Sequence, residues 1–249
     1  MRFTIPKSTD FKKVVQVLTK ISDEVPLKVT HEGLTCRVLS EDKTTLTSLY
    51  LSASMFEEVE VEGEEVFKVR TKDLANVAKR ASRNDIAEFE LDRANRILTV
   101  RLRDKKTGVI RQFDIPVSLE VEGGVGEINL SYPVTFEVLA SDFKEVLSDL
   151  KIVGDEVEIS YSQGKIRFRS EGVGRVYEAF MEQDRPLIYL SANEEPVSSV
   201  YAVDLLAPTM KVASASSVVR VSFGENIPIQ LKFDIKGQGT ITYWLAPRT

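Results

Sequence analysis

The sequence is poor in the residues on which most enzyme chemistry depends. Its 249 residues include one histidine, His31, and one cysteine, Cys36. A single cysteine excludes an internal disulfide and a cysteine-based zinc site. A single histidine excludes a metal pair or a proton relay built from several histidines. We interpret His31 as a solvated residue at a turn and Cys36 as a small buried residue on a strand.

Phosphate-binding motifs, long apolar runs and an excess of positive charge are also absent. Neither G-x-G-x-x-G nor G-x-x-x-x-G-K-[ST] occurs, and no apolar run approaches the roughly 18 residues of a membrane span. The 33 basic and 38 acidic residues give a net charge of −5, so contact with nucleic acid or membrane has to be confined to a local patch. Residues 1–7 lack the apolar core of a secretory signal. We expect a soluble cytoplasmic protein without a cofactor.

Paired acidic residues are present, but the sequence does not assemble them into a catalytic site. Glu57-Glu58, Glu64-Glu65 and Glu194-Glu195 are adjacent pairs, which 38 acidic residues produce by chance. We therefore predict no catalytic residue and no metal ligand. A carboxylate-based hydrolase is the alternative from another class, and it requires two acids with shifted pKa values in one cleft.

The most informative feature is an internal repeat. Residues 10–25 and 142–157 match at eight of sixteen positions without a gap, and residues 79–82 and 211–214 match at three of four positions with the same offset of 132. Chance does not readily give two such matches at one spacing. We predict two copies of one fold, residues 1–117 and 131–249, joined by a glycine-containing connector at residues 118–130.

Each predicted copy contains two short amphipathic helices, because apolar residues recur at helical spacing in four segments. The four apolar stripes are Phe11, Val14, Val15, Leu18 and Ile21; Leu74, Val77, Ala78 and Ala81; Phe143, Val146, Leu147 and Leu150; and Leu205, Leu206, Met210 and Ala213. The expected N-caps are Ser8, Thr9 or Asp10, then Thr71 or Asp73, then Ser141 or Asp142. Pro208 is tolerated only in the first turn of the fourth helix.

Elsewhere apolar and polar residues alternate with a period of two, which is typical of strands. Leu98, Val100 and Leu102 alternate with polar residues, and residues 227–235 do the same. Turn-forming sequences at residues 92–95, 105–108 and 236–239 separate such runs and predict antiparallel hairpins. The predicted fold class is α+β, with two duplicated strand-rich domains and helices on one face of the sheets.

Positive charge is concentrated on the polar faces of the predicted helices. The basic residues on these faces and at their ends are Lys12, Lys13, Lys20, Lys72, Lys79, Arg80, Arg83, Lys144, Lys151 and Lys211. One interpretation is that they are ordinary solvated lysines and arginines. The other is a cationic surface that faces a polyanion such as nucleic acid. Such a surface would bind without preference for base sequence, because phosphate contacts carry no base information.

The chain resembles DNA sliding clamps of the proliferating cell nuclear antigen family, archaeal type, over essentially its whole length. The segments that carry the resemblance are residues 33–43 (GLTCRVLSEDK) continuing into 44–49, residues 72–80, residues 222–228 (SFGENIP) and residues 243–248 (YWLAPR). The resemblance implies a non-enzymatic processivity factor. It also implies three two-domain subunits in a ring that encircles duplex DNA, with helices lining the hole and sheets outside.

The resemblance further implies the roles of particular residues. The expected DNA-facing residues are Lys12, Lys13, Lys20, Lys72, Lys79, Arg83, Lys144, Lys151 and Lys211. The expected pocket for a short peptide with apolar and aromatic anchors, carried by polymerases, ligases and flap nucleases, comprises Leu39, Thr44, Leu46, Val125, Ile128, Pro228, Leu245 and Ala246. A separate clamp loader is expected to supply ATP hydrolysis.

Subunits of this family join strand to strand, and the matching segments are residues 109–115 and 175–181. The expected interface residues are Val109, Ile110, Arg111, Phe113, Arg175, Val176, Tyr177 and Ala179. The alternative for both segments is an internal hairpin strand. A homotrimer, one subunit of a heterotrimer and a checkpoint-type clamp all remain compatible with the sequence.

Overall fold

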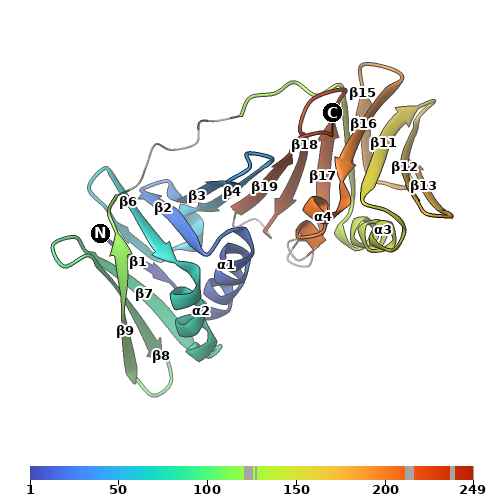
Figure 1. Ribbon diagram of the computed structural model, residues 1–249. Helices are drawn as coiled ribbons and strands as arrows, with labels where there is room; N and C mark the ends of the chain where they lie inside the picture. Colours follow the sequence, from blue (N-terminus) through green and yellow to red (C-terminus); the bar gives the residue numbers. More distant parts are fainter. Residues whose placement is uncertain (121–125, 127, 211–215, 236–238, 249) are drawn as a thin grey trace. The chain divides into compact units, whose positions relative to one another are not determined.

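The computed structural model describes residues 1–120, 126, 128–210, 216–235 and 239–248, except for the side chains of Val17, Lys20 and Ile21. The chain divides into two compact units, Met1–Val38 with Ser48–Gly126, and Leu39–Thr47 with Glu127–Thr249. Each unit is described by itself (Figure 1). No helix among the described residues is long and apolar enough to cross a membrane.

The described residues of the first unit form nine strands and two α-helices. In chain order its elements are β1 (Arg2–Ile5), α1 (Ser8–Ile21), β2 (Glu24–Thr30), β3 (Gly33–Leu39), β4 (Thr45–Ser52), the 3₁₀ turn η1 (Ala53–Met55), β5 (Glu58–Glu60), β6 (Glu64–Arg70), α2 (Thr71–Arg80), β7 (Asp85–Asp92), β8 (Ile97–Asp104) and β9 (Ile110–Ser118). Neighbouring strands follow the order β4-β3-β2-β6-β9-β8-β7-β1-β5. The tip of the β3–β4 hairpin belongs to the second unit.

The second unit repeats the pattern of strand, helix and strands. Its elements are β10 (Val134–Leu139), α3 (Ala140–Val153), β11 (Glu156–Ser162), β12 (Lys165–Gly172), β13 (Arg175–Gln183), β14 (Pro186–Leu187), β15 (Tyr189–Ala192), β16 (Val197–Ala202), α4 (Val203–Leu206), β17 (Val218–Phe223), β18 (Ile229–Asp234) and β19 (Gly239–Leu245). Its strands follow the orders β15-β10-β17-β18-β19 and β14-β13-β12-β11-β16.

The helices cover one face of the sheets in each unit, and the aromatic core lies beneath them. In the first unit α1 and α2 lie side by side (Figure 1), and the ring of Phe89 stacks on Phe3 (centroids 4.5 Å apart) and meets Phe11 edge-on (5.2 Å). In the second unit Phe168 meets both Phe136 and Phe143 edge-on. The apolar stripes predicted for α1, α2 and α3 are buried wherever their side chains are described.

The strands of the predicted hairpins pair as expected, although residues 236–238 of the third predicted turn lie outside the described residues. Cys36 is buried and His31 exposed, as predicted. The predicted fourth helix is wrong in its extent. Helix α4 ends at Leu206, and a second helical segment begins at Thr209, just after Pro208. Ala207 keeps helical dihedrals (φ −55°, ψ −37°), so the break comes from Pro208 itself, which has no backbone N–H to donate to the preceding turn. Lys211 and Ala213 lie outside the described residues.

Candidate functional site

Exposed cations follow one stripe along α2. Lys72, Asn76 and Lys79 are exposed at helical spacing, while Val77 on the opposite side is buried. Arg83 is exposed as well, but it lies in the loop beyond the helix. Helix α2 ends at Arg80, since the next residue has an extended backbone (φ −68°, ψ 134°).

Helix α1 places its basic residues differently. Lys13 is exposed and forms an ion pair with Asp10 (Nζ–Oδ1 3.4 Å), whereas Lys12 is half-buried. Lys20 belongs to α1, and its side chain lies outside the described set. Asp10 also lies near the positive end of the helix, where a carboxylate is stabilised.

Helix α3 separates its charges into two adjacent stripes. Lys144, Ser148 and Lys151 are exposed at a spacing of four and three residues. The neighbouring stripe carries Glu145 and Asp149. The structure therefore presents lysines on one line of α3 and carboxylates on the next.

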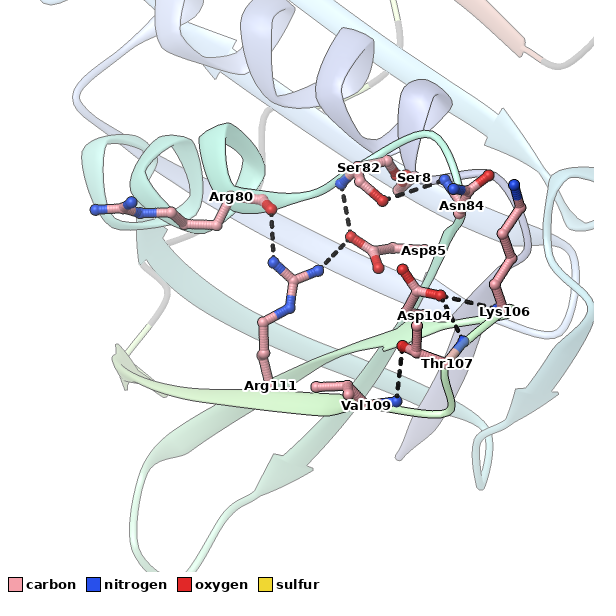
Figure 2. A network of polar contacts seen from close by, with 10 residues as sticks. All are labelled: Ser8, Arg80, Ser82, Asn84, Asp85, Asp104, Lys106, Thr107, Val109 and Arg111. Carbon is pink, nitrogen blue, oxygen red and sulfur yellow. Dashed lines mark hydrogen bonds and ion pairs between the residues drawn. The ribbon is translucent and has the colours of Figure 1, made fainter.

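A network of polar contacts holds the end of α2 (Figure 2). The guanidinium of Arg111, on β9, donates from Nη1 to the carbonyl oxygen of Arg80 (2.9 Å) and from Nη2 to the fully buried carboxylate of Asp85. Asp85 Oδ2 also accepts a hydrogen bond from the backbone N–H of Ser82 (2.6 Å), and Ser8 donates its hydroxyl to the Ser82 carbonyl. The loop that carries Arg83 is thus fixed to both α1 and β9.

The turn between β8 and β9 is fixed next to this network. Asp104 Oδ1 accepts hydrogen bonds from the backbone N–H groups of Thr107 (2.9 Å) and Lys106 (2.8 Å), and these hold the pKa of its carboxyl below the usual range. The backbone N–H of Lys105 donates to the carbonyl of Asn84 (3.0 Å). The turn is therefore closed by Asp104 and joined to the start of β7 through Asn84.

Two segments that carry residues predicted for the peptide pocket meet in the second unit. The backbone N–H of Ala246 donates to the carbonyl of Thr44 (2.9 Å), which brings the β3–β4 tip against the end of β19. Leu39 is exposed, Leu46 and Leu245 are buried, and Ile128 and Pro228 are half-buried. Val125 lies outside the described residues.

Sequence reasoning missed two aromatic residues beside this group. Trp244, the single tryptophan, directly precedes Leu245, and its indole N–H approaches the hydroxyl of Tyr132. Neither polar atom makes a hydrogen bond of good geometry to a described residue, and burial raises the pKa of Tyr132 to about 12. Trp244 is the single tryptophan of the chain, and this was the signal in the sequence that could have identified the position.

The two predicted interface segments form sheet edges. From Ile110 to Pro116, β9 pairs with β8 and with no other described strand. From Arg175 to Met181, β13 pairs with β12 and with no other described strand. Large apolar side chains on these edges face solvent: Ile110 and Phe180 are each 57% exposed and Val176 is 59% exposed.

The remaining interface candidates line the same edges. Val109 and Arg175 are exposed, while Phe113, Tyr177 and Ala179 are half-buried on the side of the helices. A different edge strand, β5, is three residues long and carries Glu58 and Glu60. Short, charged edges resist pairing with another chain, and long apolar ones favour it.

Comparison with protein families gives matches in both halves. Residues 2–122 match the model of the proliferating cell nuclear antigen N-terminal domain, and residues 126–248 match that of the C-terminal domain. DNA polymerase sliding clamp 2 of Sulfurisphaera tokodaii is 29% identical over 248 residues, which span 100% of this chain and 99% of the relative. The DNA polymerase sliding clamp of Pyrococcus horikoshii is 29% identical over 241 residues, which span 96% of this chain and 94% of the relative.

Solved structures agree with this assignment. A PCNA2–PCNA3 complex from Sulfolobus tokodaii matches with a TM-score of 0.85 at 25% identity, over 100% of this chain and 99% of the other. PCNA from Thermococcus kodakaraensis shares the fold, with a TM-score of 0.87 at 24% identity over 99% of both chains. On the evidence of both family models and the full-length relatives, the chain belongs to the proliferating cell nuclear antigen family.

Proposed function

We propose that the protein is a DNA sliding clamp: a non-catalytic ring that encircles duplex DNA in the cytoplasm, at the nucleoid, and tethers replication and repair enzymes. The observation that carries the proposal is the match of both halves to clamp-family domains over the full length of named clamps. The exposed lysines of α2 and α3 support the proposal, because they form local lines of positive charge on a chain whose net charge is −5. A cationic lining tolerates DNA while an acidic exterior does not.

We further propose that the ring closes by pairing β9 of one subunit with β13 of the next. Both edges are long, apolar and unpaired among the described strands, and joining them would satisfy their free backbone groups. In this proposal the domains are residues 1–117 and 131–249, and the connector is residues 118–130. A separate clamp loader, driven by ATP hydrolysis, places the ring on DNA in this proposal.

Topological retention on DNA tests the proposal directly. The protein is assembled around a nicked plasmid by mixing at high concentration, and complexes are isolated by gel filtration. We expect the protein to stay with circular plasmid and to be lost after a single restriction cut, because a ring slides off a free end. Equal retention on circular and linear plasmid would contradict a sliding clamp.

Replacing Lys12, Lys13 and Lys79 with alanine tests the proposed lining. Each removed phosphate contact lowers the slope of log affinity against log salt by about 1, so we expect a total decrease of about 2 to 3 for binding to short linear duplex DNA. The measurement is the affinity for a short linear duplex across a salt series. Lys165→Ala on β12 is the matched control, since its side chain is paired with Glu182 (3.1 Å). An unchanged slope would show that these three lysines do not contact DNA phosphates.

Replacing Ile128 with glutamate tests the proposed partner pocket. A bound peptide would cover the charge at this half-buried position, so affinity for a peptide with an aliphatic and an aromatic anchor should fall at least about 30-fold. The fluorescence of Trp244 beside the site reports binding. Leu130→Glu, on the same segment but outside the proposed pocket, should bind normally. Equal binding by the Ile128 variant would contradict the assignment.

A second candidate is one subunit of a mixed ring. The full-length structural match to a PCNA2–PCNA3 complex favours it. The native mass of the purified chain separates the two: about 84 kDa for a homotrimer (3 × 27.9 kDa) and 27.9 kDa for a chain that requires other subunits.

A further inference from the structure

Pro228, a residue of the proposed peptide pocket, lies just before β18 and beside the end of β19. Ile229 of β18 pairs with Leu245 of β19, so the antiparallel register places Pro228 next to Ala246. The backbone N–H of Ala246 in turn donates to the carbonyl of Thr44 (2.9 Å). Pro228 is half-buried, so part of its ring is open to a bound peptide. The shape of this wall of the proposed pocket therefore depends on the orientation of the Pro228 ring.

The Pro228 ring takes its orientation from the residue before it. Proline has no backbone N–H, so Pro228 cannot donate a hydrogen bond to a neighbouring strand. Its ring nitrogen belongs to the peptide bond that it shares with Ile227. That bond is planar, so the carbonyl of Ile227 and the first atoms of the ring lie in one plane. A group that holds the Ile227 carbonyl therefore also orients the Pro228 ring.

A buried tyrosine from the other sheet of the second unit holds this carbonyl. Tyr201 lies on β16, in the sheet β14-β13-β12-β11-β16, whereas Ile227 leads into β18 of the other sheet (Figure 1). The Tyr201 side chain is fully buried, and its hydroxyl donates to the carbonyl oxygen of Ile227 (3.2 Å). Burial raises the pKa of Tyr201 to about 12, against a smaller opposite effect of Ser199, so the hydroxyl stays protonated at neutral pH.

The loop that carries Ile227 is closely packed on its own residues. A carbon added at Gly224 would lie 2.8 Å from Cδ1 of Ile227 and 2.7 Å from Cδ of Pro133, so both side chains pack directly on this glycine. These contacts hold the Ile227 side chain, while the Tyr201 hydroxyl sets the direction of its carbonyl. Because a buried carbonyl without a donor is unstable, loss of the hydroxyl would turn this carbonyl and the Pro228 ring without unpacking the loop.

We propose that Tyr201 is a positioning residue of the partner-peptide pocket and orients the Pro228 ring through the carbonyl of Ile227. The inference rests on the proposed function, because that proposal supplies the peptide. Tyr201 is fully buried, so its effect on binding has to pass through a residue that the peptide can touch. A wall that is already oriented before the peptide arrives lowers the ordering that binding requires.

Tyr201→Phe tests the proposal, because it removes the hydroxyl and keeps the buried ring. The probe is a synthetic peptide with an aliphatic and an aromatic anchor, titrated by calorimetry, and its affinity should fall about three- to tenfold. Tyr243→Phe is the matched control, since this buried tyrosine also donates its hydroxyl to a backbone carbonyl, that of Leu205 in α4 (2.7 Å). The control should bind within about twofold of the wild type. Urea unfolding verifies that both variants are folded at the temperature of the titration.

A second set of variants tests the route through Pro228. Pro228→Ala removes the ring that Tyr201 orients, so adding Tyr201→Phe to Pro228→Ala should weaken binding by less than about twofold further. A general loosening of the unit would instead lower the affinity by the same factor in both backgrounds. Factors that multiply would therefore overturn the positioning of Pro228 by Tyr201.

The outcomes separate this inference from the proposed function. Normal peptide binding by Tyr201→Phe, or equal losses for the Tyr201 and Tyr243 variants, overturns the positioning role and leaves the pocket in place. A wild-type chain that does not bind the peptide contradicts the pocket and the positioning role together. Retention on circular plasmid does not involve the peptide, so it still decides in that case whether the chain is a clamp.

Discussion

Replacing Asp85 with alanine is expected to lower the free energy of unfolding of the first unit by about 3 kcal/mol. The Asp85 side chain is fully buried and pairs with Arg111, so its removal leaves a partly buried guanidinium without its counter-charge. It also removes the acceptor for the Ser82 N–H. Urea unfolding followed by circular dichroism measures the loss, and hydrogen exchange of β7 and β9 amides locates it.

Two further variants identify the cause of this loss. Arg111→Ala should cost at least as much as Asp85→Ala, because it leaves a fully buried carboxylate unpaired. The double variant should cost less than the sum of the two, because it removes both charges together. Arg103→Ala breaks a partly exposed pair with Glu88 on the neighbouring strands and should cost less than about 1 kcal/mol. Additive costs for Asp85 and Arg111 would contradict the network in Figure 2.

The local part of the fold could be predicted from the sequence. Apolar residues at helical spacing define α1, α2 and α3, because burial of one helix face depends on nearby residues. The turns at residues 92–95 and 105–108 specify hairpins for the same reason. The repeat at an offset of 132 residues revealed the duplication without any knowledge of the core.

The helix starts were predicted less well, because long-range contacts use the residues expected as caps. Helices α1 and α2 begin after Lys7 and Arg70, and neither has a side-chain cap. Ser8 instead donates its hydroxyl to the carbonyl of Ser82, 74 residues away, and Thr71 donates to the carbonyls of Ser22 (2.9 Å) and Asp23 (3.1 Å). The capping preference of a residue type does not reveal that its hydroxyl will instead donate a hydrogen bond to a carbonyl in a neighbouring loop.

In the candidate site too, features set by nearby residues could be predicted, and features set by contacts distant in sequence could not. The spacing of Lys72 and Lys79 puts both on one exposed stripe of α2, as periodicity predicts. Arg83 lies beyond the helix, and its loop is held by Asp85 and Arg111, which no short-range pattern joins. Open edges arise at Ile110–Pro116 of β9 and Arg175–Met181 of β13 because β6 and β14 pair only with the ends of these strands, and where those pairings stop depends on contacts that short-range patterns do not reveal.

Replacing Gly172 with alanine is expected to destabilise the second unit by about 3 kcal/mol. A methyl group at this position would lie 1.8 Å from the carbonyl oxygen of Val153, which is backbone at the end of α3. The facing Gly154 also lies too close for a side chain, since its added carbon would lie 2.4 Å from the carbonyl oxygen of Glu171. Alanine can fit only if α3 and β12 move apart. Urea unfolding followed by the fluorescence of Trp244 measures the loss.

This close approach of two glycines also sets the position of α3 beside the β13 edge, so the effect extends beyond stability. Moving α3 away from β12 lengthens the hydrogen bond from Arg175 to Ile152 and shifts α3 relative to the β13 edge, which is proposed above to join subunits. Gly172→Ala should therefore weaken self-association even at temperatures where the chain is folded. Gly174→Asn is the matched control, because its position is open and its positive φ (70°) suits asparagine. A Gly172→Ala chain with wild-type stability and association would show that this backbone contact does not position α3.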